Sequence, residues 1–263
     1  MKRPHLLSLC VLSLALALAA GNSTCAQDAA TPKTTLRIVT FNIQIGRGPG
    51  GDYSNPAEAH LDRTAAALKA LNPDIAGLQE VDVKSTRAGM DVDQLAEIAH
   101  PLGLIPTFSM KVAQHGGEYG IGTLSKTPPL KTSKVLMKGS AHTRVLQICE
   151  FENFVFFNTH LPLTEPLRIE AAKTIEQEAL KYTKPIILLG DLNALPDSPE
   201  ITMLKKHWTQ ISANSPTYPS PAPTDQIDYI FIRNAPNARV LETRVIEDKT
   251  TSDHRPVLSV VEF

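Results

Sequence analysis

An adjacent acid and histidine near the C-terminus are the residues of this sequence best suited to proton chemistry. They lie in the segment Ser252-Asp253-His254-Arg255-Pro256, which leads directly into the apolar run Val257–Val261. Histidine changes charge near neutral pH, so such a pair can hold or move a proton there. The structural alternative is a surface turn, in which aspartate is also common.

A further carboxylate, that of Asp228, lies inside the otherwise apolar segment Ile227–Ile230. An unpaired charge in an apolar strand is costly. Asp228 therefore requires a cation or a hydrogen-bond donor as its partner, and a histidine would serve.

Other polar residues follow or end apolar runs. Asp191 and Asn193 come directly after Ile186–Leu189, and their i+2 spacing on an extended backbone would direct both side chains to the same side. Glu80 follows a similar run and Asn42 ends another. Each has an ordinary alternative, which is a local turn for Asp191 and Asn42 and a solvated strand end for Glu80.

Several familiar catalytic and binding motifs are excluded. The segment Gly46–Gly51 formally fits a dinucleotide-binding loop, but Pro49 and the polar stretch to Pro56 separate it from any helix that could bind a pyrophosphate. The sequence contains no His-Glu-x-x-His, no Gly-x-Ser-x-Gly and no paired cysteines for zinc. A metal ion, if one is bound, must therefore be held by oxygen.

The elements that must position these residues follow an α/β pattern. Apolar runs without polar alternation indicate strands buried on both faces, and segments with helical periodicity occur between them. The expected strands are Leu36–Phe41, Asp74–Leu78, Thr143–Glu150, Phe154–Phe157, Ile186–Leu189, Tyr229–Ile232 and Val257–Val261. The expected helices are Ala57–Leu71, Asp91–Leu102 and Glu165–Tyr182, and the expected loops are Gly46–Pro56, Val112–Gly120 and Ser212–Asp225.

A strand-helix-strand unit occurs twice along the chain. In each copy a strand with a polar end leads through a helix and a proline to a strand with an acidic end. Two such halves packed together predict a sandwich of two sheets covered by helices. The unit would also gather four polar side chains at one edge of the sheets, namely Asn42, Glu80, His160 and Asp191.

The N-terminus has the features of a secretory signal peptide. Met1-Lys2-Arg3 precedes the uncharged apolar run Leu6–Ala20, which is shorter than the roughly 18 residues needed to cross a membrane. We expect residues 1–26 to be the signal peptide and residues 27–263 to be the mature domain, secreted or periplasmic and without a transmembrane segment. The alternatives are cleavage near Ala19 or Ala20 and a lipid anchor on Cys25.

The composition is that of an ordinary globular protein. With 263 residues, 42% hydrophobic and 20% charged, the chain belongs to neither the disordered nor the collagen-like class. Removal of residues 1–26 would leave 24 of the 26 basic residues against all 27 acidic ones, a net charge of −3. Of the three cysteines only Cys149 would remain, so no internal disulfide is expected. This charge gives no sign of a protein dominated by nucleic-acid electrostatics.

Taken together, the polar segments resemble those of the metal-dependent endonuclease/exonuclease/phosphatase superfamily over nearly the whole mature chain. The resemblance implies that family's four-layer α/β/β/α sandwich of two packed mixed sheets flanked by helices. The Asn-Thr-His-Leu segment and Tyr119–Lys126 are similar to the branch that includes sphingomyelinases and related phosphatases. The segments that match, in family order, are Thr40-Phe41-Asn42, Leu78-Gln79-Glu80-Val81, Asn158-Thr159-His160-Leu161, Gly190-Asp191-Leu192-Asn193, Ile227-Asp228-Tyr229-Ile230-Phe231 and Ser252-Asp253-His254.

The resemblance also implies a magnesium site. Glu80 would be the principal Mg²⁺ ligand, with Asn42 and Asp253 beside it, and Mn²⁺ could substitute. So sparse a set suits magnesium, which keeps several waters and takes only one or two carboxylates from the protein.

The remaining matched residues would carry out the chemistry. Asp191 would orient or deprotonate the attacking water, and Asn193 would hold that water or a phosphate oxygen. His254, paired with Asp228, and His160 would stabilise charge on the pentacovalent phosphate. The assignment of acid and base among these groups is left open.

Four residues are candidates of second rank. Arg144 and Arg168 could contact phosphate or the metal surroundings, or could be ordinary surface or helix charges. His115 and Glu118 could border the site from the loop that contains Gly116-Gly117, or could simply belong to mobile surface.

We therefore expect a secreted, metal-dependent phosphoric ester hydrolase, either a phosphodiesterase or a phosphatase, that acts as a monomer. Its substrate would be a phosphorylated small molecule or a lipid head group. A DNA or RNA nuclease of the same fold is the alternative within enzymes, which the near-balanced charge disfavours. A non-catalytic binding protein that keeps the fold is the alternative from another class.

Overall fold

The computed structural model describes residue 1, residues 33–52, residue 55 and residues 59–263. The predicted signal peptide, residues 1–26, lies outside the described residues apart from Met1. The chain divides into the units 1–32 and 33–263, and every element below belongs to the second unit. Within the described ranges, no helix is long and apolar enough to cross a membrane.

Two mixed six-stranded sheets form the centre of this unit. The first sheet has the strand order β11-β12-β1-β2-β4-β3, and the second has the order β5-β6-β7-β8-β10-β9. The strands are β1 (Thr35–Asn42), β2 (Ile75–Val83), β3 (Ile105–Gln114), β4 (Gly117–Ser125), β5 (Lys131–Met137), β6 (Arg144–Glu150), β7 (Val155–His160), β8 (Ile186–Asp191), β9 (Thr209–Gln210), β10 (Asp228–Arg233), β11 (Arg239–Val245) and β12 (Val257–Glu262).

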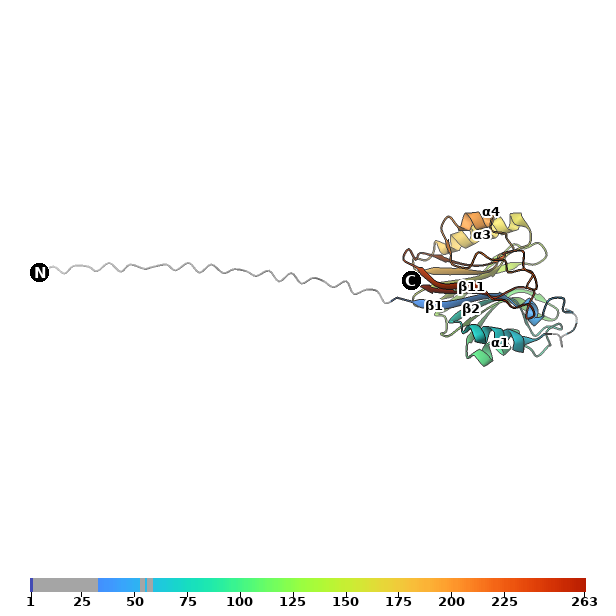
Figure 1. Cartoon of the computed structure of the whole chain (residues 1–263). Helices are drawn as coiled ribbons and strands as arrows, with labels where there is room; N and C mark the ends of the chain where they lie inside the picture. Colours follow the sequence, from blue (N-terminus) through green and yellow to red (C-terminus); the bar gives the residue numbers. More distant parts are fainter. Residues whose placement is uncertain (2–32, 53–54, 56–58) are drawn as a thin grey trace. The chain divides into compact units, whose positions relative to one another are not determined.

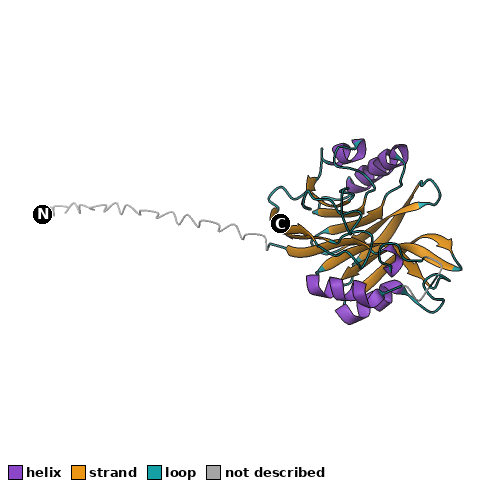
Figure 2. Cartoon of the chain, turned by 45° about the vertical axis from the view of Figure 1, so that its right-hand side comes forward, coloured by secondary structure: helices purple, strands orange, loops and turns teal. Residues whose placement is uncertain are grey.

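Helices cover the outer face of each sheet (Figure 1). Helices α1 (Leu61–Leu71) and α2 (Gln94–Ala99) pack on the first sheet, and α3 (Glu165–Ala179) and α4 (Pro199–Leu204) pack on the second. The described residues also contain two short 3₁₀ helices, η1 (Gln44–Gly46) and η3 (His100–Leu102). Figure 2 shows the strands as the inner layers between these helices. The predicted four-layer α/β/β/α sandwich is confirmed.

Burial on both faces explains why the central strands lack polar alternation. All residues of β7 and β8 are buried, because a helix covers one face of these strands and the other sheet covers the second face. The layer between the sheets is apolar and includes Ile38, Phe156 and Ile187. The catalytic candidates can therefore come only from strand ends and from irregular positions.

The doubled unit predicted from the sequence is present. Strands β1 and β2 are parallel and are joined through α1, and strands β7 and β8 are parallel and are joined through α3. Parallel neighbours have their carboxyl ends at the same edge of a sheet. This connectivity places Asn42, at the end of β1, and Asp191, at the end of β8, within hydrogen-bond distance of each other.

The helix ends differ in detail from the predictions. The helix expected over Ala57–Leu71 begins at Leu61, and residues 57 and 58 lie outside the described residues. The helix expected from Asp91 begins at Gln94, because the side chain of Asp93 accepts a hydrogen bond from the backbone N–H of Ala96 and caps it. The third helix ends at Ala179 rather than Tyr182.

The prediction of a loop over Val112–Gly120 was wrong. Strand β3 continues to Gln114 and β4 begins at Gly117, so the segment is a β-hairpin. Its two turn residues, His115 and Gly116, both have positive φ values, 51° and 76°, as a tight primed turn requires. Of the two glycines that indicated a loop, Gly116 therefore lies at the tip of a hairpin and Gly117 begins β4. Helix α4 and strands β5, β9 and β11 were also missed.

Candidate active site

Polar side chains from both sheets converge on one cavity of about 570 Å³. Its walls include six of the eight residues predicted for the site, and the other two, Asn42 and Asp228, lie behind them in direct contact. The six residues in the walls are Glu80, His160, Asp191, Asn193, Asp253 and His254. The structure therefore brings the whole predicted set together.

Glu80 reaches the cavity through a β-bulge. The pairing between β2 and β4 shifts between Gln79 and Val81, so Glu80 has no register partner. Its φ of 58° is unusual for a residue other than glycine. The bulge leaves Gln79 and Val81 buried while Glu80 is partly exposed. A bulge re-aims a side chain in this way, and strained backbone of this kind is concentrated at functional sites.

Asn42 lies between two carboxylates. Its Nδ2 is 3.3 Å from Oε1 of Glu80 and 3.0 Å from Oδ2 of Asp191, and its Oδ1 accepts a hydrogen bond from the backbone N–H of Gln44. The amide nitrogen therefore faces the acids. The Asn42 oxygen could take part in metal binding only after the amide group rotates.

The carboxylates of Glu80 and Asp253 form the part of the site that suits a hard cation. Asp253 lies in the same cavity wall, and burial raises the pKa of its carboxyl group; the nearby His254 opposes this rise and Glu80 adds to it. A cation bound beside Asp253 would favour its ionised form. The donor set of Glu80, Asp253 and the Asn42 amide fits Mg²⁺, which prefers oxygen ligands.

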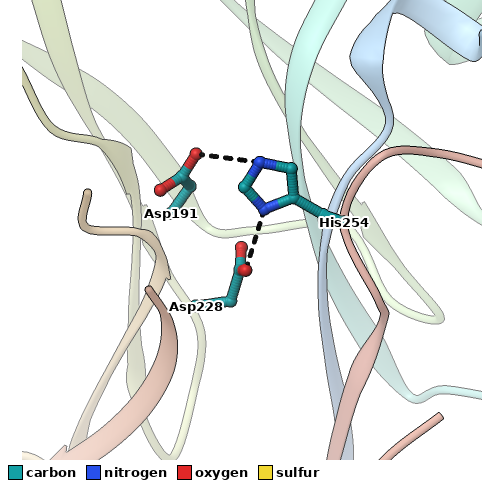
Figure 3. Close-up of side chains that lie close together, drawn as sticks. All are labelled: Asp191, Asp228 and His254. Carbon is teal, nitrogen blue, oxygen red and sulfur yellow. Dashed lines mark hydrogen bonds and ion pairs between the residues drawn. The ribbon is translucent and has the colours of Figure 1, made fainter. Parts of the chain in front are cut away.

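A buried cluster of Asp191, Asp228 and His254 lies next to these residues (Figure 3). Nδ1 of His254 is 2.9 Å from Oδ2 of Asp228, and its Nε2 is 3.7 Å from Oδ2 of Asp191. Burial disfavours the charged ring, but the two flanking carboxylates outweigh this effect and raise the pKa of His254. The ring is therefore held as an imidazolium, with both nitrogens directed to acids, rather than as a neutral metal ligand.

Thr217 supports the Asp228 carboxylate. Its hydroxyl donates to Oδ2 of Asp228 over 2.6 Å, while Oδ1 of Asp228 is buried without a hydrogen-bond partner among the described residues. The partner that the sequence required for Asp228 is thus present, and it is His254 with help from Thr217. Nothing in the sequence of the proline-rich segment 212–225 distinguished Thr217.

Asp191 is the most contacted acid of the site. Its Oδ2 also lies 3.5 Å from Nε2 of His160, and its Oδ1 accepts the backbone N–H of Asn193 over 2.9 Å. The local turn considered for this segment is therefore present and supports the site. Burial raises the pKa of Asp191, so this acid is a stronger base than an exposed aspartate.

His160 and Asn193 complete the candidate set. Burial, Arg144 and Lys111 lower the pKa of His160, so its ring is neutral at physiological pH. The side-chain amide of Asn193 donates to the carbonyl oxygen of Leu161, which fixes the loop after β8 against the loop after β7. His160 can therefore donate a hydrogen bond to a ligand without adding a positive charge.

The four candidates of second rank differ in whether they line the cavity. Arg144 and His115 line the cavity, whereas Glu118 and Arg168 are not among its lining residues. Arg168 forms an ion pair with the fully buried Glu200 and joins α3 to α4. The interpretation of Arg168 as a helix charge is therefore supported, and the prediction that it contacts phosphate is not.

Sequence reasoning missed part of the wall. Arg87, Lys111, Tyr119 and Tyr218 also line the cavity. The Tyr218 ring packs against His254, with 4.9 Å between ring centroids. Tyr119 belongs to a segment that matches the family, and Lys111 directly precedes the segment predicted to be a loop.

Residues 39–254 match the Endonuclease/Exonuclease/phosphatase family, and the chain belongs to this family. Members of this family are generally metal-dependent phosphoesterases. No curated protein matches the chain.

Solved structures of low sequence identity share the fold. An endonuclease/exonuclease/phosphatase family protein from Bacteroides thetaiotaomicron is 19% identical, with a TM-score of 0.71 over 88% of this chain and 96% of that one. A mannosyl-6-phosphatase from Bacteroides thetaiotaomicron is 19% identical, with a TM-score of 0.69 over 87% and 100%. Truncated Caenorhabditis elegans TDP2 is 18% identical, with a TM-score of 0.62 over 86% and 97%.

Proposed function

We propose that this protein is a Mg²⁺-dependent hydrolase of phosphoester bonds, in which water attacks phosphorus directly. The observation that carries the proposal is the convergence in one cavity of two kinds of group. Glu80 and Asp253 offer partly exposed carboxylate oxygens, while Asp191 and His254 form a buried acid and imidazolium ion pair in which His254 is hydrogen-bonded to Asp228. Membership of a family of generally metal-dependent phosphoesterases supports the same class of reaction.

Mg²⁺, when bound by Glu80, Asp253 and a rotated Asn42 amide, would supply positive charge to a phosphoryl oxygen. The protein's own groups do the rest of the work. Glu80 is held toward the cavity by its bulge, and Asp253 is fixed by a hydrogen bond from its backbone N–H to Oε1 of Gln44.

Asp191 orients the attacking water and accepts its proton. Its raised pKa brings it closer to neutral pH than an exposed aspartate, which is the range in which a general base is most effective. The backbone N–H of Asn193 holds Oδ1 of Asp191 in place in either orientation of the Asn42 amide. The carboxylate is therefore positioned before any substrate binds.

His254 and His160 stabilise the charge that develops on the phosphate. Asp228 keeps His254 protonated and oriented, so a charged donor is available without reorganisation. His160 provides a neutral donor in the same wall. Phosphoryl transfer depends mainly on positioned charge, and these groups provide it.

The test is an assay of the purified protein against a panel of phosphomonoesters and phosphodiesters. We expect hydrolysis with Mg²⁺, activity with Mn²⁺ as a substitute, no hydrolysis in excess EDTA, and recovery when Mg²⁺ is added back. Full activity in EDTA would contradict the metal requirement. Failure to hydrolyse any ester of the panel with either metal would contradict the proposed function itself.

We further propose that the protein is exported and acts as a monomer on a phosphorylated small molecule or a lipid head group. The basis for export is the N-terminal segment of residues 1–26. Mass spectrometry of the protein recovered from the periplasm or medium should show a chain that begins at Gln27. A chain that retains residues 1–26 would contradict export by this route.

A further inference from the structure

Two cations line the cavity close to the catalytic candidates. Lys111 and Arg144 are each only 8% exposed, although lysine and arginine are rarely so buried without a partner. Both line the same cavity as Glu80, His160 and Asp191. Their positive charges also act together to lower the pKa of His160. The cations and the proposed reaction site are therefore parts of one pocket.

The placement of Lys111 mirrors that of Glu80. Strand β4 lies between β2 and β3, and both neighbours bulge at the same level. The register shifts between Gln79 and Val81 on one side, and between Met110 and Val112 on the other. Gly120 is the register partner of both Val81 and Met110. Glu80 and Lys111 are thus the extra residues of paired bulges, and both line the cavity.

Tyr119 supports this part of the wall. Nζ of Lys111 lies 4.5 Å from the centroid of the Tyr119 ring, and the guanidinium carbon of Arg87 lies 4.8 Å from the same centroid. Arg87 differs from Lys111 because its charge is balanced. Its Nε and Nη2 donate to the two oxygens of the fully buried Asp82. Arg87 therefore holds the ring, while Lys111 stays available to a ligand.

Neither Lys111 nor Arg144 has such a counter-ion in the part of the chain that the structure describes. The observed ion pairs and side-chain hydrogen bonds include neither side chain, and Nη1 of Arg144 is buried with no hydrogen-bond partner. Burial, followed by repulsion from Arg144, lowers the pKa of Lys111 to about 7. The carboxylates of Glu80 and Asp191 in the same cavity favour both charges but form no ion pair or hydrogen bond with them among the described residues. Buried cations without a directly paired anion are unfavourable, and a bound anion reduces that penalty.

We propose that Lys111 and Arg144 bind a phosphoryl group that carries two negative charges, so that the substrate is a phosphomonoester rather than a phosphodiester. The proposal rests on the phosphoester hydrolysis proposed above. A phosphomonoester near neutral pH carries close to two negative charges on three terminal oxygens. A diester carries one charge and must place a second substituent in the pocket. Two cations without a directly paired counter-ion match the monoester, and arginine can bind two of its oxygens at once.

The test compares two substrates with the same leaving group, p-nitrophenyl phosphate and methyl p-nitrophenyl phosphate. The wild-type protein should prefer the monoester. Lys111→Gln and Arg144→Gln should each lower kcat/KM for the monoester by roughly 10- to 100-fold, as expected for the loss of a charged hydrogen bond, and should change the diester much less. Lys134→Gln is the matched control, because Lys134 is exposed on β5 and donates to the carbonyl oxygen of Met110 outside the cavity.

A second measurement is independent of turnover. Titration calorimetry with inorganic phosphate in EDTA at pH 7 should detect binding to the wild-type protein and to Lys134→Gln, and much weaker binding to Lys111→Gln and Arg144→Gln. Circular dichroism and thermal unfolding establish that each variant is folded. If Arg144→Gln does not fold, Lys111→Gln decides the result alone.

The outcomes separate this proposal from the proposed function. A protein that hydrolyses both substrates equally well, and whose variants lose both activities in parallel, is still a hydrolase but overturns the preference for monoesters. Phosphate binding that is unaffected by Lys111→Gln also overturns it. A protein that binds phosphate through these two cations but hydrolyses no ester retains the anion site and loses the proposed reaction.

Discussion

The two strand-helix-strand halves of this protein share one topology but contribute different groups to the site. The first half, β1-α1-β2, supplies Asn42 and the partly exposed Glu80, which stands on a bulge. The second half, β7-α3-β8, supplies His160 and Asp191, which are register partners in a regular parallel ladder and are buried. The bulge and the burial, rather than the topology, are the basis for proposing that one acid binds a cation and the other accepts a proton.

The largest effect should come from the second half. Asp191→Asn removes the proposed base but keeps the size of the side chain, so kcat/KM should fall by about 10²- to 10⁴-fold, the usual range for general-base catalysis. The measurement is steady-state hydrolysis at saturating Mg²⁺. Calorimetric titration with Mg²⁺ should be nearly unchanged, because the proposed ligands remain. A variant with near-normal turnover would remove Asp191 from the mechanism.

Glu80→Gln tests the first half, where the variant should change Mg²⁺ binding rather than proton transfer. The loss of a carboxylate ligand should weaken Mg²⁺ binding by at least about 10-fold, a loss that is common even for residues that only support metal ligands. Excess Mg²⁺ should restore part of the activity of Glu80→Gln and none of the activity of Asp191→Asn. Equal recovery of the two variants would show that the two halves do not differ in the proposed way.

Two glycines, one in each half, allow the halves to be compared by their effect on folding stability. A Cβ on Gly77 in β2 would lie 2.2 Å from a side-chain carbon of Leu189, so Gly77→Ala should destabilise the fold by about 1–3 kcal/mol through overpacking. A Cβ on Gly190 would lie 1.8 Å from the backbone oxygen of Thr159, and Gly190 has a φ of 145°. Gly190→Ala should therefore cost more, about 2–6 kcal/mol, because backbone strain is added.

Denaturant unfolding of both variants measures this difference. Gly190 lies directly before Asp191, and Gly77 lies two residues before the bulge that presents Glu80. A Gly77→Ala variant that is less stable than Gly190→Ala would show that the regular ladder of the second half is the more tolerant of the two.

The smallest expected effect is that of salt. If the cavity binds one small phosphoester, kcat/KM should change little between about 50 and 200 mM salt at fixed Mg²⁺. A nuclease that contacts several phosphates would lose affinity steeply, with a slope of about −0.9 per contact on duplex DNA. Efficient cleavage of plasmid DNA with such a slope would favour the nuclease alternative and would extend the site beyond the two halves.

Much of the site could be predicted because its residues lie at the ends of buried strands. Asn42, His160 and Asp191 end strands whose apolar runs are evident in the sequence, and Asp228 begins another. The connection of each pair of strands through a helix then places the strand ends at one edge. The need of Asp228 for a partner followed from its place in an apolar segment, and the choice of His254 as that partner followed from the family resemblance.

The edge strands could not be predicted in the same way. Strands β5 and β11 are largely exposed, and their residues carry no continuous apolar signal. Lys111 lies on β3. The sequence pattern did not predict this strand, and its last residues fall in the segment predicted to be a loop. With β3 and its bulge unrecognised, the cationic part of the wall could not be assembled.

The sequence by itself determined the central strands with the helices that join them, the sandwich of two sheets, and the acids and histidines at or beside the ends of the apolar runs, because apolar periodicity and the placement of polar residues are local properties. Only the tertiary structure decided the functions available to them. The direction of the Asn42 amide, the bulges at Glu80 and Lys111 and the unpaired charge of Arg144 all depend on register and on neighbours distant in the chain. Burial and charge are set by those neighbours, and they distinguish an acid that can hold a cation from one that can accept a proton.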